Sequence, residues 1–219
     1  DRYVWTKPSS FMRNLVVGTN GTLQLAGLSL TARELTGSGV GNNNSGLETL
    51  LTVGSSTGGN WHGTVTNTGG GGVALRKVGT GTWLVSGKNY FDNGQSFAFQ
   101  NQINQGTVII TNGGVIRSGY LQLQIANGAG QTGTVVVAGG LLAVTNNVLS
   151  IGYGSSTADG TLIVNDGTVD HSGYSPGSFA AVANSIDVGA QGAVGRLIVN
   201  GGQVLNDLPL FLGDGATAS

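Results

Sequence analysis

Short apolar runs separated by glycine-containing turns recur along the second half of the chain. Starting at Gly106, a Gly-Thr or Gly-Arg pair leads into three residues drawn from Val, Leu and Ile, at 106–110, 133–137, 160–164 and 195–199. The starts of these runs are separated by 27, 27 and 35 residues. The runs are too short for helices and rich in β-branched residues, so the pattern predicts β-strands.

Each repeat also predicts two further strands. A glycine corner follows the first run, as at 165–167, and leads to a second strand such as 203–205 and a third that ends in an apolar-Gly pair, as at 149–152. Three strands and three corners return the chain to its start one strand spacing further on, about 4.8 Å. The repeat therefore predicts an all-β parallel β-helix, or solenoid, with three short strands per coil.

The alternation of side chains within the first strand predicts which residues form the core. Leu162 and Val164 point to one side of their strand and Ile163 to the other. We expect the inward residues of successive coils to stack as one ladder, formed by Val135, Val137, Leu162, Val164, Leu197 and Val199. Asn165 and Asn200 occupy matching corners and predict a second ladder of side-chain amides. The 35-residue interval predicts an inserted loop at 171–183.

The first half of the chain contains similar apolar runs and glycine corners at less regular intervals. Runs such as 51–54 and 63–65 resemble the later strands, whereas 41–46 is predicted to be an exposed loop. We therefore interpret 1–219 as a single solenoid segment of a longer chain, with irregular coils at 1–76 and regular coils at 106–213. We predict no capping element for the solenoid at either end of the sequence.

Glycine content could also indicate a flexible linker. The chain has 41 Gly among 219 residues and only 9% charged residues, but 39% of its residues are hydrophobic. Disordered segments lack the apolar residues that offset the entropy of ordering. The composition therefore favours a folded chain.

Charge and cysteine content exclude several classes of protein. A net charge of −1 argues against nucleic-acid binding, which needs a basic patch. No apolar stretch is long enough for a transmembrane helix, and the absence of cysteine excludes disulfides and thiolate metal sites. Residues 1–117 carry a net charge of +4 and the rest −5. This split suggests head-to-tail attraction between copies, although so few charges could also divide this way by chance.

One stretch of the chain carries a recognisable repeat. Lys77-Val78-Gly79-Thr80-Gly81-Thr82-Trp83-Leu84-Val85-Ser86-Gly87-Lys88-Asn89-Tyr90, followed by 105–108, resembles the autotransporter-associated β-strand repeat. The cassettes of 131–213 are similar to the repeat shared by type V secretion passengers and proteins with a PEP-CTERM sorting signal. The resemblance implies a right-handed β-helix in a secreted bacterial surface protein, with no catalytic motif and no cofactor. Phe91-Asp92-Asn93-Gly94 departs from the family pattern, so the geometry after Tyr90 is left open.

Candidate catalytic and metal-binding residues are few. Asp166, Asp170 and Asp187 are the carboxylates that could pair for glycoside hydrolysis, but acidic corners are more often solvated turns. The two histidines, His62 and His171, are far apart in the sequence and predict no metal site or catalytic triad. Gly213-Asp214-Gly215 has the composition of a calcium-binding turn without the repeat that such sites need. We therefore expect no catalytic residues, no metal and no enzymatic activity.

Aromatic side chains at predicted turns are the remaining candidates for ligand binding. The residues that could contact a glycan or receptor are Trp61, His62, Tyr153, His171 and Tyr174. Packing of these rings over corners is the alternative. The sequence thus predicts a structural or adhesive stalk or fibre, covered at its ends by neighbouring repeats or copies of itself. A carbohydrate-active enzyme or carbohydrate-binding module on the same fold is the alternative function.

Overall fold

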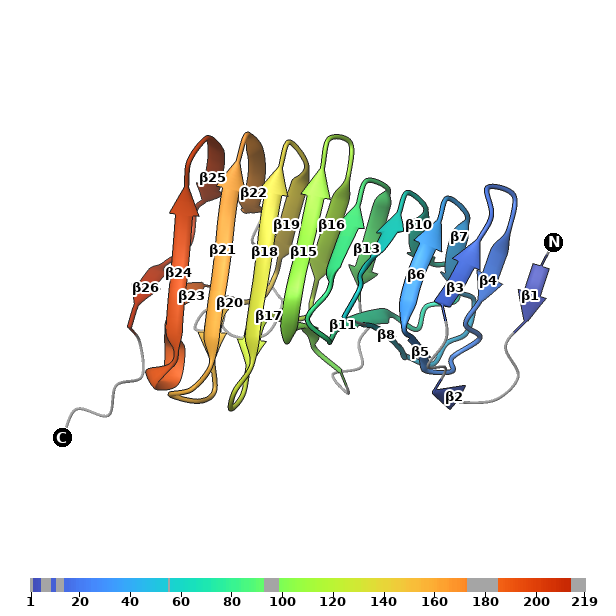
Figure 1. Cartoon of the computed structure of the whole chain (residues 1–219), viewed down its shortest axis with the longest axis horizontal. Helices are drawn as coiled ribbons and strands as arrows, with labels where there is room; N and C mark the ends of the chain where they lie inside the picture. The colour runs from blue at the N-terminus through green and yellow to red at the C-terminus, as the bar shows by residue number, and fades with distance from the viewer. Residues whose placement is uncertain are drawn as a thin grey trace.

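The computed structural model describes residues 2–4, 9–10, 14–54, 56–92, 99–172 and 185–213, and the side chains of this set other than 2–4, 9–10 and Asp92. These residues form a parallel β-solenoid with three strands per coil, as the repeat predicts (Figure 1). The one helical element of the described residues is a short 3-10 turn, Ala190–Gly192. No helix in this part of the chain is long and apolar enough to cross a membrane.

Every third strand belongs to the same sheet, and each sheet runs the length of the described coils. The first sheet, called sheet A, contains β1 (Arg2–Val4), β4 (Thr22–Gln24), β7 (Val40–Asn43), β10 (Thr64–Asn67), β13 (Lys88–Asp92), β16 (Val115–Gly119), β19 (Leu141–Thr145), β22 (Gly167–His171) and β25 (Gly202–Asn206). Sheet B contains β2 (Ser9–Ser10), β5 (Leu30–Ala32), β8 (Thr49–Val53), β11 (Val73–Lys77), β14 (Asn101–Ile103), β17 (Leu123–Asn127), β20 (Leu149–Tyr153), β23 (Ile186–Val188) and β26 (Leu210–Leu212). Sheet C contains β3 (Asn14–Val17), β6 (Glu34–Gly37), β9 (Gly59–Trp61), β12 (Thr82–Val85), β15 (Gln105–Thr111), β18 (Thr132–Ala138), β21 (Asp159–Asn165) and β24 (Val194–Val199).

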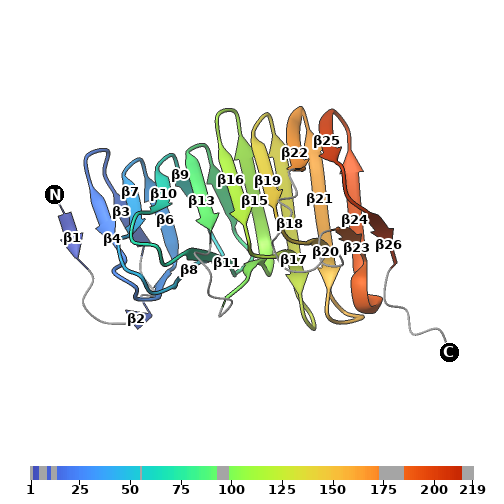
Figure 2. The same ribbon diagram turned by 180° about the vertical axis from the view of Figure 1, so that it is seen from behind.

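The chain winds in the right-handed sense that the resemblance implies. In Figure 1 it runs up sheet C at the front and down sheet A behind, while it advances from right to left. Figure 2 shows sheet A from the other side. Corners between the sheets need glycine where the coils approach closely. At Gly58, the backbone has a positive φ, and a Cβ atom would clash with the carbonyl oxygen of Thr82 in the next coil.

The predicted core ladder is present in register. Val135 pairs with Leu162 and Leu162 with Leu197, while Val137 pairs with Val164 and Val164 with Val199. The side chains of Val135, Val137, Leu162 and Val164 are at most 2% exposed. Leu197 is only partly buried and Val199 is 51% exposed, because both lie in the last described coil, where no further coil covers them. The prediction that Val199 is a buried core residue is therefore wrong.

The predicted amide ladder is also present. The side-chain amide of Asn200 donates to Oδ1 of Asn165 at 2.8 Å, and both residues lie at the corner that follows sheet C. The ladder is partly exposed to solvent, which is consistent with a structural role for these amides.

The prediction of an exposed loop at 41–46 is wrong for 41–43 and is confirmed for 44–46, where Asn44 and Gly46 are exposed. Residues up to Asn43 belong to β7, and Asn43 is completely buried. Its side-chain amide donates to carbonyl oxygens of the next coil at Gly71 and Gly72, at 2.8 and 3.0 Å. Because Asn is common in exposed turns, composition alone does not reveal that this residue joins coils inside the solenoid.

The first half of the chain consists of genuine coils that are shorter than the later ones. Val17 pairs with Gly37 in the next coil, which is a shorter step along the chain than the one from Ile110 to its partner Val137. The regular period is reached only from β15 onward. This change of coil length hides the repeat in the N-terminal sequence.

Candidate functional site

Two of the predicted surface contacts lie inside the solenoid. Trp61 is 0% exposed, and its Nε1 donates to Oδ1 of Asn89 at 2.8 Å. His171 is 1% exposed, and its two ring nitrogens lie 3.0 Å from Oδ1 of Asn206 and 2.9 Å from the carbonyl oxygen of Asn147. The prediction that Trp61 and His171 contact a ligand at the surface is wrong, since both side chains are enclosed by neighbouring coils.

Sheet geometry explains why these rings point inward. Trp61 ends β9, in register with the inward Val85 of the next coil, and is not in the turn that its glycine-rich neighbours suggest. Trp83 is also completely buried, which places Leu84 on the outer face, as their alternation requires. Tryptophan N–H groups find partners when buried. That of Trp83 donates to the carbonyl oxygen of Leu35 at 3.2 Å.

The other three predicted contacts are dispersed. His62 is exposed and its Nδ1 lies beside the Ser86 hydroxyl. Tyr153 is half-buried, and its hydroxyl accepts from the side-chain amide of Gln191 at 3.1 Å. Tyr174 lies outside the described residues, as does most of the predicted loop at 171–183. Within the described residues, His62 belongs to the coil of β9 and Tyr153 to the coil of β20, so the structure does not bring them together.

The candidate carboxylates do not converge either. Asp166 precedes β22 and Asp170 lies further along that strand. Their backbones are therefore separated by about 13 Å, at about 3.3 Å per residue of strand. Asp187 lies on sheet B, on another face of the solenoid. Asp170 accepts hydrogen bonds from the backbone N–H and the hydroxyl of Ser172, so it stabilises a turn. The described residues contain no cluster of three or more potential metal-ligating side chains, and Asp214 lies outside them.

Lys77 is a buried cation that the sequence reasoning did not single out. Its side chain is 1% exposed, and its ammonium group donates to the carbonyl oxygens of Val78, Gly79 and Gln105 at 2.8, 2.8 and 3.1 Å. Desolvation lowers the pKa of Lys77 to about 8. A lysine with a lowered pKa can be a nucleophile, but this one is enclosed and saturated with backbone acceptors, so its geometry suits the joining of two coils.

Corner glycines leave an open groove of about 390 Å³ beside sheets C and A. It is lined by Gly139, Gly140, Asp166, Gly167, Thr168, Gly202 and Gln203. The lining is mostly backbone, and two of its side chains bond to one another, Gln203 donating to the Thr168 hydroxyl at 3.3 Å. It holds one carboxylate and no aromatic ring, which gives it little to recognise a ligand.

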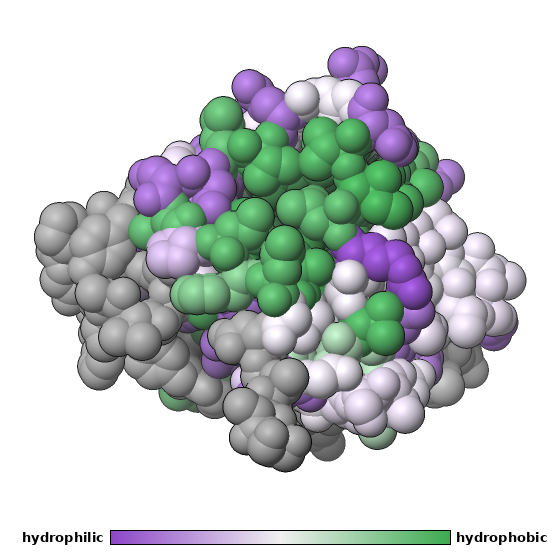
Figure 3. Space-filling model, turned by 90° about the vertical axis from the view of Figure 1, so that its left-hand side faces the viewer, coloured by the Kyte–Doolittle hydropathy of each residue, from purple (hydrophilic) through white to green (hydrophobic). Residues whose placement is uncertain are grey.

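The last described coil exposes a continuous apolar surface. Figure 3 views the solenoid from this end and shows apolar residues across its centre. The large apolar residues exposed in this coil are Val194, Ile198, Val199, Leu205, Leu210, Phe211 and Leu212. Three of them have buried partners one coil earlier. Val164 is 0% exposed against 51% for Val199, Ile186 is 1% exposed against 50% for Leu210, and Val188 is 8% exposed against 73% for Leu212. The inward residues of this coil form the C-terminal end face: Leu197, Val199, Val204, Leu210 and Leu212.

Comparisons with known proteins identify no relative of this chain. No protein-family model, no curated protein and no solved structure matches the chain.

Proposed function

We propose that this chain is a structural segment of an extracellular stalk or fibre, in which further β-coils stack on the C-terminal end face. The observation that carries the proposal is the contrast between that face and the coil beneath it. At the inward positions, Val164, Ile186 and Val188 are buried under the last described coil, whereas their partners Val199, Leu210 and Leu212 in that coil are exposed. A solenoid gains its stability from such contacts between neighbouring coils, so each added coil can lengthen the rod through the same kind of contact.

The end face offers both parts of a coil-to-coil interface. Strands β24, β25 and β26 are each paired on one side only within the described residues, so their other edges are open to parallel pairing. The exposed side chains of Val199, Leu210 and Leu212 between these edges supply the apolar surface that a further coil would bury. The open strand edges and the exposed end of the hydrophobic core lie on the same face. Another coil could pair with the edges and cover the core at once, whereas a flat partner surface could not.

We propose that a second copy of the segment covers the C-terminal end face in the isolated protein. The positive net charge of 1–117 and the negative net charge of 118–219 favour head-to-tail contact over head-to-head contact. Location outside the cell is supported by the resemblance of 77–108 to exported passenger repeats. A role in adhesion would follow from placing a binding domain at the end of such a stalk.

Analytical ultracentrifugation and negative-stain microscopy of the purified chain test head-to-tail stacking. We expect linear oligomers that lengthen with concentration and shorten at high salt, because salt screens the charge term and leaves the apolar term. Leu212→Lys should disperse them, since it places a charge on the end face. Leu47→Lys is the matched control, because Leu47 is 68% exposed at a corner and away from the C-terminal coil.

Dispersed monomers of the unmodified chain at every concentration and at both low and high salt would contradict the stacking of copies. Equal oligomerisation of Leu212→Lys and Leu47→Lys would show that the contact lies elsewhere.

A further inference from the structure

The outer face of sheet C carries a regular grid of small side chains. Thr82, Thr107, Thr134 and Thr161 are register partners on four successive strands. A second row lies two residues after each threonine and continues onto β24. It consists of Leu84, Ile109, Val136, Ile163 and Ile198. Both rows alternate with buried residues, so they point to solvent. Figure 1 shows β15, β18, β21 and β24 side by side at the front.

The threonine hydroxyls are available to a ligand. Within the described part of the chain, none of the four donates or accepts a side-chain hydrogen bond, although Thr111 on the same face donates to the Val85 carbonyl oxygen. Parallel pairing along the whole of β15, β18 and β21 holds the rows rigidly. Each threonine therefore presents a fixed methyl group beside a free hydroxyl.

This face carries few of the charges that a solvated sheet normally has. On β12, β15 and β18 the outward side chains are Thr, Gln, Ala, Leu, Ile and Val. Charges lie on either side of these three strands: Glu34 on β6, and the exposed ion pair of Asp159 on β21 with Arg196 on β24. Long charged side chains are the usual protection of an exposed sheet. Their absence from β12, β15 and β18 indicates that this part of the face meets an uncharged surface.

The size of the face argues against a second folded protein. Five strands at about 4.8 Å, each of four to seven residues at about 3.3 Å per residue, make a face of roughly 500 Å². A stable protein interface needs about 800 Å² on each partner. A rigid face smaller than this suits an extended, repeating ligand.

We propose that the outer face of sheet C binds ice. Rows of hydroxyls repeat at the strand spacing, about 4.8 Å, and each threonine lies about 6.7 Å from the aliphatic residue two positions on. These two distances are close to the oxygen repeats of a prism face of hexagonal ice. The hydroxyls can occupy water positions in the lattice, and the methyl groups order the water between them. Because the sheet is rigid, little further entropy is lost when these waters freeze in place.

Partitioning into slowly growing ice tests the proposal directly. The purified chain is frozen from one side beside an inert reference protein, and its concentration is measured in the ice and in the liquid; freezing-point hysteresis is recorded on the same sample. We expect the chain to be enriched in ice relative to the reference. Thr134→Lys should lose this enrichment, because it places a charge in the centre of the grid.

Thr168→Lys is the matched control, since Thr168 lies on the outer face of sheet A and is half-buried like Thr134. Thr107→Lys serves as a second grid variant should Thr134→Lys unfold, as judged by circular dichroism. Exclusion of the unmodified chain from ice would overturn the proposal, as would equal enrichment of Thr134→Lys and Thr168→Lys. Loss of self-association in Thr134→Lys without ice uptake would assign the face to copies of the chain and also overturn it.

The test is independent of coil stacking. Leu212→Lys alters only the C-terminal end face, so it should keep its partition into ice while losing linear oligomers. Failure of one proposal therefore leaves the other standing.

Discussion

Replacing Asn43 by alanine should destabilise the fold far more than replacing its neighbour Asn44. The Asn43 side chain is completely buried and connects three successive coils. Its Oδ1 accepts from the backbone N–H groups of Gly27 and Ser45 at 3.0 and 3.2 Å, and its Nδ2 donates to the carbonyl oxygens of Leu47, Gly71 and Gly72 at 2.8, 2.8 and 3.0 Å.

The expected magnitude follows from the groups that lose a partner. A buried polar group left unsatisfied costs about 1 to 3 kcal/mol. Alanine at 43 leaves two N–H groups without their acceptor and removes the donor from three carbonyls, although Gly72 keeps a bond from the Thr49 N–H. Since part of this set is reached by solvent, we expect a loss of about 3 to 5 kcal/mol in the free energy of unfolding.

Urea unfolding followed by circular dichroism measures this difference. Asn44 is exposed, and no hydrogen bond of its side chain occurs among the described residues. Substitutions at such surface positions change the free energy of unfolding by less than about 0.5 kcal/mol, and we expect the same of Asn44→Ala. Similar small effects of both substitutions would refute the conclusion that Asn43 joins the coils.

Two further predictions concern the core and its buried charge. Val164 is 0% exposed and Val199 is 51% exposed in the same ladder. Val164→Ala should therefore cost about 2 kcal/mol of unfolding free energy and Val199→Ala clearly less in monomeric protein, and equal losses in thermal unfolding would mean that Val199 is covered. Between pH 8 and about 10.5 the folded Lys77 has released its proton while the unfolded one still holds it. The free energy of unfolding should rise with pH over this range by at most about 3 kcal/mol. Lys77→Met should lack this rise and Lys88→Met, at an exposed position, should retain it; identical pH profiles of the two variants would show that burial does not lower the pKa of Lys77.

Local patterns were sufficient to predict the architecture but not the environment of single residues. The alternation at 160–164 predicted which side of β21 faces inward, and the structure buries Leu162 and Val164. The same reasoning could not place Trp61, because glycines on both sides suggested a turn. Its burial depends on pairing with Val85 in the next coil, which is distant in the sequence.

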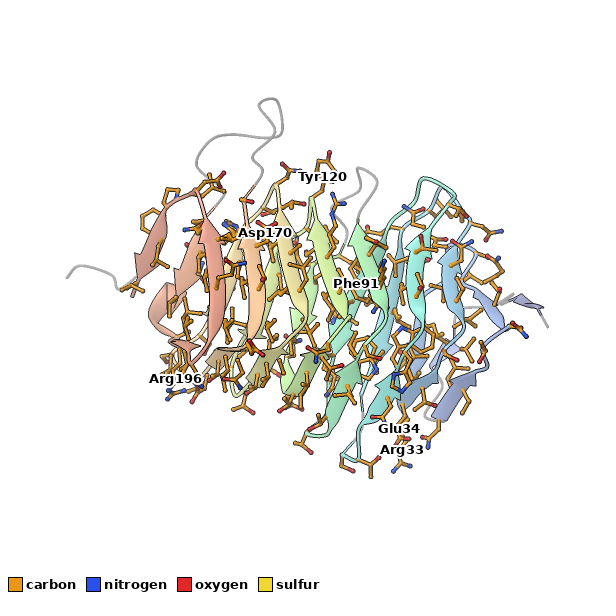
Figure 4. All side chains as sticks on the ribbon, turned by 90° about the horizontal axis from the view of Figure 1, so that it is seen from above. Arg33, Glu34, Phe91, Tyr120, Asp170 and Arg196 are labelled. Atoms are coloured by element: carbon orange, nitrogen blue, oxygen red, sulfur yellow. The ribbon has the colours of Figure 1, made fainter. Side chains whose placement is uncertain are left out.

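Side chains viewed from above show how widely the polar residues are spread (Figure 4). Asp170 and Arg196 lie on opposite sides of the solenoid in this view, in agreement with their places in sheets A and C. A sequence gives their order along the chain, whereas winding into coils decides which of them share a face. The sequence showed which carboxylates and rings the chain contains, but only the stacking of coils showed where each of them lies.

The sequence by itself determined the strand, the corner and the period of the regular coils, because alternation of side chains and glycine conformation are local properties. Only the tertiary structure decided that Asn43 and Lys77 are buried joints, that Val199 is exposed, and that four threonines form one uncharged row. Each of these depends on what lies in the coils next to the residue, which are far from it along the chain. Burial in a solenoid is thus set by neighbouring coils, and sequence periodicity reveals it only where the coil length is constant.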